Sequence, residues 1–120
     1  MEETTTSAIE HCLRVASGFE PGSDEEKVAI YHDHIEDGNE AGVPAEIRAH
    51  VEVLTRAEGE AYSDYIARIK VSGDPVAIAV KIADLRDNLA RCRGEHGGHI
   101  KPHLAPRYER ALLELGAVSA

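Results

Sequence analysis

One segment of the sequence constrains the fold more than any other: residues 75–91 are apolar around almost the whole circumference of the helix they would form. Its apolar side chains are Val76, Ala77, Ile78, Ala79, Val80, Ile82, Ala83, Leu85 and Leu89. The dipeptide Asp74-Pro75 in front of them is typical of a helix N-cap followed by the first turn. A helix that is apolar on nearly all sides has to be buried, so we predict that this is the central helix of the domain.

Glycine and proline divide the remaining chain into segments of helical length. Apolar residues recur at helical spacing in residues 6–17, 44–54, 62–69 and 106–115. Residues 23–37 open with Ser23 and Glu26 in a capping-box pattern, which predicts a further helix there. No segment alternates between apolar and polar residues over a useful length, which is the pattern of a half-buried strand. The sequence therefore predicts an all-α fold, a compact bundle of about six helices that forms one domain over residues 1–120.

The composition excludes several classes of partner. The net charge is −9, from 13 basic and 22 acidic residues, and only four Tyr and one Phe are aromatic. A nucleic-acid-binding surface needs a basic footprint and rings for stacking, so we expect no nucleic-acid partner. No apolar run approaches the ~18 residues of a membrane span, and the acidic N-terminus is unlike a secretory signal, so we expect no membrane association. Two distant cysteines, Cys12 and Cys92, fit a cytoplasmic protein without disulfides.

Polar residues interrupt the apolar helix at regular spacing. Lys81, Asp84 and Asn88 are three and four residues apart, which places them along one face. Burying the carboxylate of Asp84 is costly unless a cation or a set of hydrogen-bond donors faces it. Within this helix alone, a purely structural interpretation, either an internal Lys81–Asp84 pair or an exposed polar stripe, is as good as a bound cation.

The segment 23–37 favours the bound cation. It contains His32-Asp33 followed by Glu36-Asp37, so that His32 and Glu36, and likewise Asp33 and Asp37, are one helical turn apart. Adjacent histidine and aspartate side chains on a helix can both bend toward one ion. An imidazole with carboxylates suits a divalent first-row ion such as Mn²⁺, Fe²⁺ or Zn²⁺.

Three ordered motifs carry a family resemblance: residues 11–16 (HCLRVA), 32–37 (HDHIED) and 80–88 (VKIADLRDN). The sequence resembles the metal-dependent HD-domain phosphohydrolases of the RelA/SpoT type, which hydrolyse guanosine tetraphosphate and related nucleotides. The first motif has Cys12 where proline is usual in that family, and residues 62–69 (YSDYIARI) resemble its connecting region. The resemblance implies an HD-type helical fold and metal-dependent hydrolysis of a nucleotide or phosphoester.

The resemblance also implies a role for individual residues. The implied metal ligands are His11, His32, Asp33 and Asp84, and manganese is the ion we expect there. The implied pair that orients or deprotonates the attacking water is Glu36 and Asp37. The implied substrate contacts are Lys81, Asn88 and Arg91.

Two departures from the family pattern bear on the substrate. The family usually has a further helix and a glycine-containing loop before the first histidine, whereas ten residues precede His11 here. The stretch between Asp37 and Pro44 is also shorter than usual. We expect both changes to leave the metal ligands intact and to weaken selectivity for the nucleotide base. The alternative function is a catalytically degenerate HD module that binds a nucleotide or a partner protein.

Overall fold

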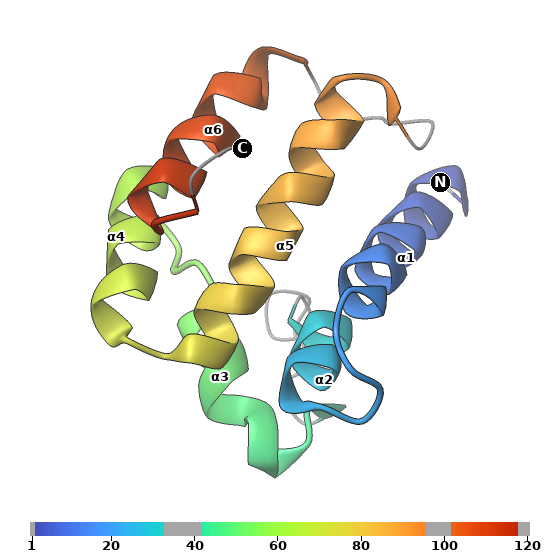
Figure 1. Cartoon of the computed structure of the whole chain (residues 1–120), viewed down its shortest axis with the longest axis vertical. Coiled ribbons are helices and arrows are strands. Elements are labelled where there is room, and N and C mark those ends of the chain that lie inside the picture. The colour runs from blue at the N-terminus through green and yellow to red at the C-terminus, as the bar shows by residue number, and fades with distance from the viewer. Residues whose placement is uncertain (1, 33–41, 96–101, 118–120) are drawn as a thin grey trace.

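The structure, a computed structural model, describes residues 2–32, 42–95 and 102–117 (Figure 1). Within those ranges the chain forms six α-helices, two short 3₁₀ segments and no strand, which confirms the all-α prediction. In chain order the elements are α1 (Glu2–Ser17), α2 (Asp24–Tyr31), η2 (Ala45–Ile47), α3 (Arg48–Val53), α4 (Tyr62–Ser72), α5 (Pro75–Cys92), η4 (Pro102–Leu104) and α6 (Ala105–Glu114). The radius of gyration is 13.7 Å, close to the ~13.6 Å expected of a compact chain of this length.

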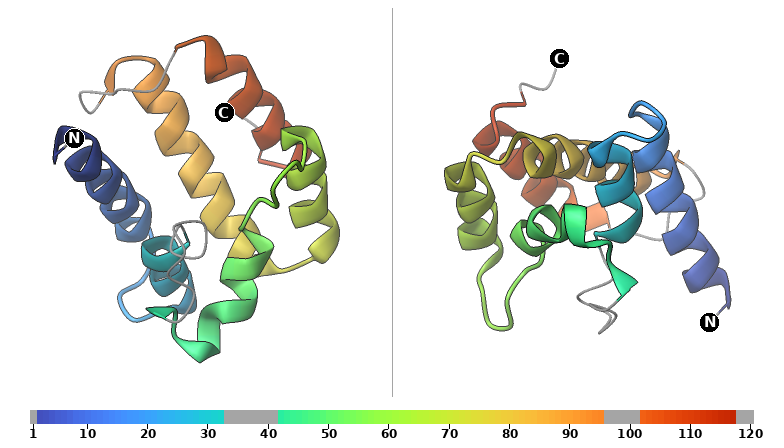
Figure 2. Two further views of the ribbon diagram at one scale, coloured as in Figure 1. Left: turned by 180° about the vertical axis from the view of Figure 1, so that it is seen from behind. Right: turned by 90° about the horizontal axis from the view of Figure 1, so that it is seen from below.

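Helix α5 is central, as its apolar composition predicts. The helices α1, α2, α3, α4 and α6 all pack against it. Figures 1 and 2 show α4 and α6 along one side of α5, and α1 and α2 along the other. The side chain of Asp74 caps its N-terminus by accepting hydrogen bonds from the backbone N–H groups of Val76 and Ala77, at 3.0 and 3.1 Å. This cap fixes where the helix begins and therefore where its polar residues lie.

Helices α1 and α2 form a pair joined by a tight turn. Gly22 has a φ of 82° in this turn, a left-handed conformation that a β-carbon disfavours. Ser23 caps α2 by accepting a hydrogen bond from the Glu26 N–H at 3.2 Å, and the Glu26 carboxylate accepts one from the Gly22 N–H at 2.8 Å. The described part of the predicted segment 23–37 ends at His32, the C-cap of α2.

The third predicted helix, residues 44–54, is shorter in the structure and begins differently. The chain enters it through the 3₁₀ segment η2, and α3 proper starts at Arg48. Ile47 and Val51 are completely buried and fix this segment against the core. His50 donates a hydrogen bond from Nδ1 to Asp74 Oδ2 at 2.6 Å and so ties α3 to the start of α5. No helix in the described ranges is both long and apolar enough to cross a membrane.

Candidate metal centre

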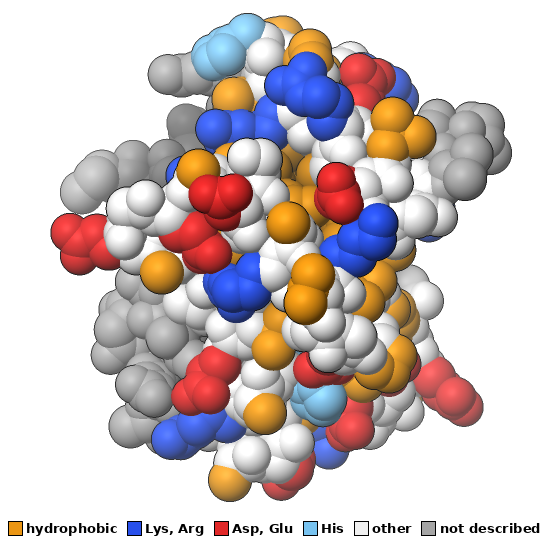
Figure 3. Space-filling view, turned by 90° about the vertical axis from the view of Figure 1, so that its left-hand side faces the viewer, with side chains coloured by type: hydrophobic (Ala, Val, Ile, Leu, Met, Phe, Trp, Pro, Cys, Tyr) orange, Lys and Arg blue, Asp and Glu red, His pale blue; other side chains and the backbone are white. Residues whose placement is uncertain are grey.

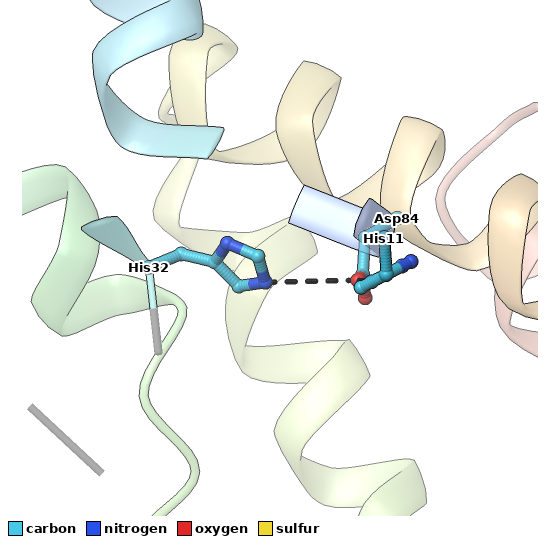
Figure 4. Close-up of side chains that lie close together, drawn as sticks. All are labelled: His11, His32 and Asp84. Atoms are coloured by element: carbon cyan, nitrogen blue, oxygen red, sulfur yellow. Dashed lines mark hydrogen bonds and ion pairs between the residues drawn. The ribbon is translucent and has the colours of Figure 1, made fainter. Parts of the chain in front are cut away.

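Three buried side chains from separate parts of the chain meet inside the bundle (Figure 4). His11 comes from α1, His32 from the end of α2 and Asp84 from the middle of α5. Their exposed fractions are 6%, 6% and 5%. One potential ligand atom of each lies within 4.8 Å of those of the other two. Two imidazoles and a carboxylate at this separation can share one metal ion.

The oxygen Oδ1 of Asp84 is the point on which both histidines converge. His11 Nε2 lies 2.6 Å from it and His32 Nε2 lies 3.6 Å from it. The other ring nitrogen of His32, Nδ1, donates to the backbone carbonyl of Ala29 at 2.8 Å. Because a carbonyl only accepts, this bond places the proton on Nδ1 and turns the Nε2 lone pair of His32 toward Asp84.

His11 is held by a second carboxylate that the sequence analysis did not assign. Its Nδ1 donates to Asp87 Oδ2 at 2.5 Å. Asp87 also accepts two hydrogen bonds from Arg14, from Nε at 2.8 Å and from Nη2 at 3.1 Å. The signal available in the sequence was spacing: His11 and Arg14 are three residues apart, as are Asp84 and Asp87, so each pair shares a helix face.

The two carboxylates favour a protonated His11. Burial lowers the pKa of its imidazole, but hydrogen bonds and negative charge from Asp84 and then Asp87 outweigh burial, so the pKa is raised. Asp87 responds in the opposite direction: burial raises the pKa of its carboxyl, and Arg14 and His11 together hold it below the usual range. A metal ion on Nε2 would take the place of a proton.

Lys81 forms an ion pair inside the centre. Its Nζ donates to Asp84 Oδ2 at 3.0 Å and lies 5.0 Å from the centre of the Tyr65 ring. Burial would raise the pKa of Asp84, but the Lys81 charge and the hydrogen bond from His11 hold it well below its usual range. The internal pair is therefore the correct interpretation of the polar stripe at Lys81, and the exposed stripe is wrong. The predicted contact of Lys81 with substrate stays a prediction.

Of the remaining candidate site residues, the structure describes two. Asn88 and Arg91 are half-buried on the same helix, and Arg91 Nη1 donates to Asn88 Oδ1 at 3.3 Å. The fourth predicted ligand, Asp33, and the predicted acid–base pair, Glu36 and Asp37, lie outside the described residues. Their roles stay predictions.

The donor set as a whole suits a borderline divalent ion. Imidazole nitrogen is a good ligand for Zn²⁺ and Fe²⁺, and carboxylate oxygen extends the range to Mn²⁺. Ligating histidines in proteins usually donate their second N–H to a carboxylate or a backbone carbonyl, as His11 does to Asp87 and His32 does to Ala29.

The chain matches no known protein family and no curated protein.

Proposed function

We propose that this protein is a divalent-metal-dependent phosphohydrolase of the HD type that acts on a nucleotide phosphate or pyrophosphate. The observation that carries the proposal is the buried cluster of His11, His32 and Asp84, whose potential ligand atoms lie within 4.8 Å of one another. These are three of the four positions that the resemblance to HD-domain phosphohydrolases assigns as ligands. They are 21 and 52 residues apart in sequence (32 − 11 and 84 − 32) and come from α1, the C-cap of α2 and α5.

The hydrogen bonds around the cluster leave one ring nitrogen of each histidine and one oxygen of Asp84 facing the position of an ion. Both histidines use Nδ1 for a protein acceptor and keep Nε2 for the centre. Lys81 takes Oδ2 of Asp84, so Oδ1 is the oxygen that faces both imidazoles. Preset ring orientations of this kind raise metal affinity because little has to be reorganised on binding.

The charges of the described residues favour an anionic substrate once a metal is present. Asp84 and Asp87 carry two negative charges, and Lys81 and Arg14 carry two positive charges, so the described cluster is neutral when both histidines are neutral. A divalent ion adds two positive charges, of which Asp33 would offset one. A positive, largely buried site attracts phosphate even in a chain whose net charge is −9.

The chemistry then divides among the side chains. When bound, a divalent ion supplies a water whose pKa is lowered to about 7 and offsets charge on the phosphate. His11, His32 and Asp84 hold that ion, Asp87 orients His11, and Lys81 holds Asp84. Glu36 and Asp37 are proposed to orient the attacking water and to take its proton. Asn88, one turn beyond Asp84 on α5, is proposed to contact the substrate together with Arg91.

The test is a screen in the presence of Mn²⁺ over guanosine tetraphosphate, nucleoside triphosphates, dinucleotide cofactors and simple phosphoesters. We expect release of phosphate or pyrophosphate from a nucleotide, with weak discrimination among bases. The Asp84→Asn variant should lose this activity. A matched control is His50→Gln, because His50 is a half-buried histidine whose partner, Asp74, is a helix cap outside the cluster.

The binding-module alternative rests on one observation, that Lys81 already neutralises Asp84 without any metal. A self-contained network of this kind would let the domain fold and bind ligands without turnover. Glu36→Gln and Asp37→Asn separate the two functions. In an enzyme they should keep the metal and lower the rate by about 100- to 10,000-fold, the usual contribution of a general acid or base. Bound metal with no turnover of any compound in the screen would favour the binding module.

A further inference from the structure

We propose that the groove between α1 and α5 binds a small alkyl carboxylate, with its carboxylate on Arg14 and Arg86 and its alkyl body along α5. The groove has a volume of about 660 Å³. That volume is within the ~300–1,000 Å³ typical of small-molecule sites. Figures 1 and 2 show α1 running beside α5 on the side away from α4 and α6.

The floor of the groove is apolar because of the residues that α5 places there. Ala79, Ala83 and Ala90 line it with Ile82, α1 contributes Val15, and the turn after α1 contributes Phe19. Alanine side chains are too short to reach α1, which leaves space between the two helices. Ala79 and Ala90 are 11 residues apart (90 − 79), a rise of about 16 Å along the helix. An alkyl chain of medium length fits along this floor.

Two guanidinium groups stand at the wall of the groove. Arg86 lines it and is exposed, and it makes no hydrogen bond or ion pair with any other described residue. Arg14 uses Nε and Nη2 for Asp87, and its Nη1 donates no hydrogen bond within the described ranges. A carboxylate can therefore accept from both arginines, a pairing in which charge strengthens each hydrogen bond.

The charge of the wall selects a monoanion. Arg14 and Arg86 carry two positive charges and Asp87, which also lines the groove, carries one negative charge, so the sum is +1. The Asp87 carboxylate is 9% exposed and already accepts from His11 and Arg14, so its repulsion of a ligand is small. The single negative charge of a carboxylate neutralises this charge of +1, whereas the two negative charges of a phosphate monoester dianion would exceed it.

None of the proposed metal ligands His11, His32 and Asp84 lines the groove. The groove adjoins the metal cluster only through Arg14 and Asp87, which line it and lie behind His11. It is also larger than the groove between α4 and α6, which measures about 280 Å³. On that second face acidic and basic side chains are interspersed among apolar ones (Figure 3), and Arg107 lies over the Tyr62 ring at 4.4 Å. The α1–α5 groove is therefore the better site for an amphipathic ligand.

The test is calorimetric or NMR titration of the full chain with octanoate, with acetate and octan-1-ol as the probes that lack the tail and the charge. We expect octanoate to bind at least about tenfold more tightly than either, because a tail gains up to about fourfold for each methylene that it buries. Arg86→Gln should weaken octanoate by about tenfold or more, since it removes a charge-assisted hydrogen bond. Arg93→Gln, an exposed arginine at the end of the same helix paired with Glu109, is the matched control and should bind like the parent.

A second variant tests the floor independently of the charge. Ala79→Leu adds a side chain to the groove at a half-buried position away from Asp84. The variant should bind octanoate more weakly than the parent does and bind acetate with unchanged affinity. The proposal is overturned if octanoate binds no better than acetate, or if Arg86→Gln binds octanoate as tightly as the parent does.

Discussion

Two charged clusters in this protein use similar groups for different purposes. The metal cluster consists of His11, His32, Lys81, Asp84 and Asp87, together with Arg14. The loop clamp consists of Arg68 and Glu60, which join α4 to the loop before it. In each cluster an arginine donates two hydrogen bonds to one carboxylate: Arg14 to Asp87 at 2.8 and 3.1 Å, and Arg68 to Glu60 at 2.9 and 3.1 Å.

The partners of the two clusters differ in where they come from. Arg68 also donates to the carbonyls of Val53 and Thr55, at 3.0 and 2.9 Å, so its acceptors all lie within residues 53–60. In the metal cluster, His11 meets carboxylates that are 73 and 76 residues away. The clamp closes a local loop and has no nitrogen lone pair for an ion. At Asp84, by contrast, imidazole nitrogens converge on a carboxylate oxygen, which gives an ion both nitrogen and oxygen ligands.

Asp84→Asn should have the largest effect of any single change. It replaces the carboxylate on which both histidines converge with a neutral amide and leaves the Lys81 ammonium buried without a counter-charge. Breaking a buried ion pair from one side typically costs about 3–5 kcal/mol in the free energy of unfolding. We also expect Mn²⁺ affinity to fall by about 100-fold or more, since one ligand charge is lost. Isothermal calorimetry and denaturant unfolding measure the two effects.

Glu60→Gln is the matched control in the loop clamp. It removes a carboxylate that is paired just as closely with an arginine but lies outside the metal cluster. Mn²⁺ affinity should be unchanged in this variant. An equal loss of Mn²⁺ affinity in Glu60→Gln and Asp84→Asn would mean that the ion binds nonspecifically to carboxylates. The distinction between the two clusters would then be wrong.

Lys81→Met tests whether a metal and the lysine serve the same carboxylate. Without metal, Asp84 would lose its buried ammonium, and we expect a cost of about 3–5 kcal/mol in the free energy of unfolding. Saturating Mn²⁺ should then stabilise the variant more than it stabilises the parent, because the ion supplies the missing positive charge. Thermal unfolding with Mn²⁺ and with a chelator measures this difference. Equal stabilisation of parent and variant would contradict the account of Asp84.

Asp87→Asn should lower the affinity for Mn²⁺ without abolishing binding. The variant leaves every proposed ligand in place but loses the carboxylate that orients His11 through Nδ1. Loss of such a partner usually lowers metal affinity by about 10- to 100-fold. Competition with a chelating dye gives the affinity. Unchanged affinity would show that His11 is oriented by its helix alone.

The sequence predicted the helices better than it predicted the contacts between them. Apolar spacing and glycine or proline punctuation are local, so they located all six helices and the buried α5. Asp87 was missed because periodicity gives the face of a residue but not its partner on another helix. The loop clamp was missed for a different reason. Two of the four acceptors of Arg68 are backbone carbonyls, which every residue has, so no residue type marks them.

The candidate site was anticipated in part. His11, His32 and Asp84 meet in the structure, as the resemblance implies, although the motifs that contain them are far apart in sequence. Lys81 was left open between an ion pair and an exposed stripe because a long side chain on a helix can turn either way. Packing against other helices turns the Lys81 side chain inward. The rings of Tyr65 and Tyr62 lie 5.0 and 6.0 Å from its ammonium, which faces Asp84.

The smallest effect that we predict is in the loop clamp and depends on pH. Hydrogen bonds from Arg68 and from the Ala57 N–H lower the pKa of Glu60 from 4.5 to about 2. A lowered pKa means that the folded state favours the ionised form. The clamp therefore contributes stability above about pH 4.5, and this contribution is lost as the pH falls toward 2. NMR titration of the Glu60 side chain should give a midpoint near 2 in the parent, and Arg68→Gln should move it toward 4.5 while Mn²⁺ affinity stays at the parent value. If the midpoint stays near 2 in Arg68→Gln, the Ala57 N–H alone holds the carboxylate, and Arg68 serves only the carbonyls of Val53 and Thr55.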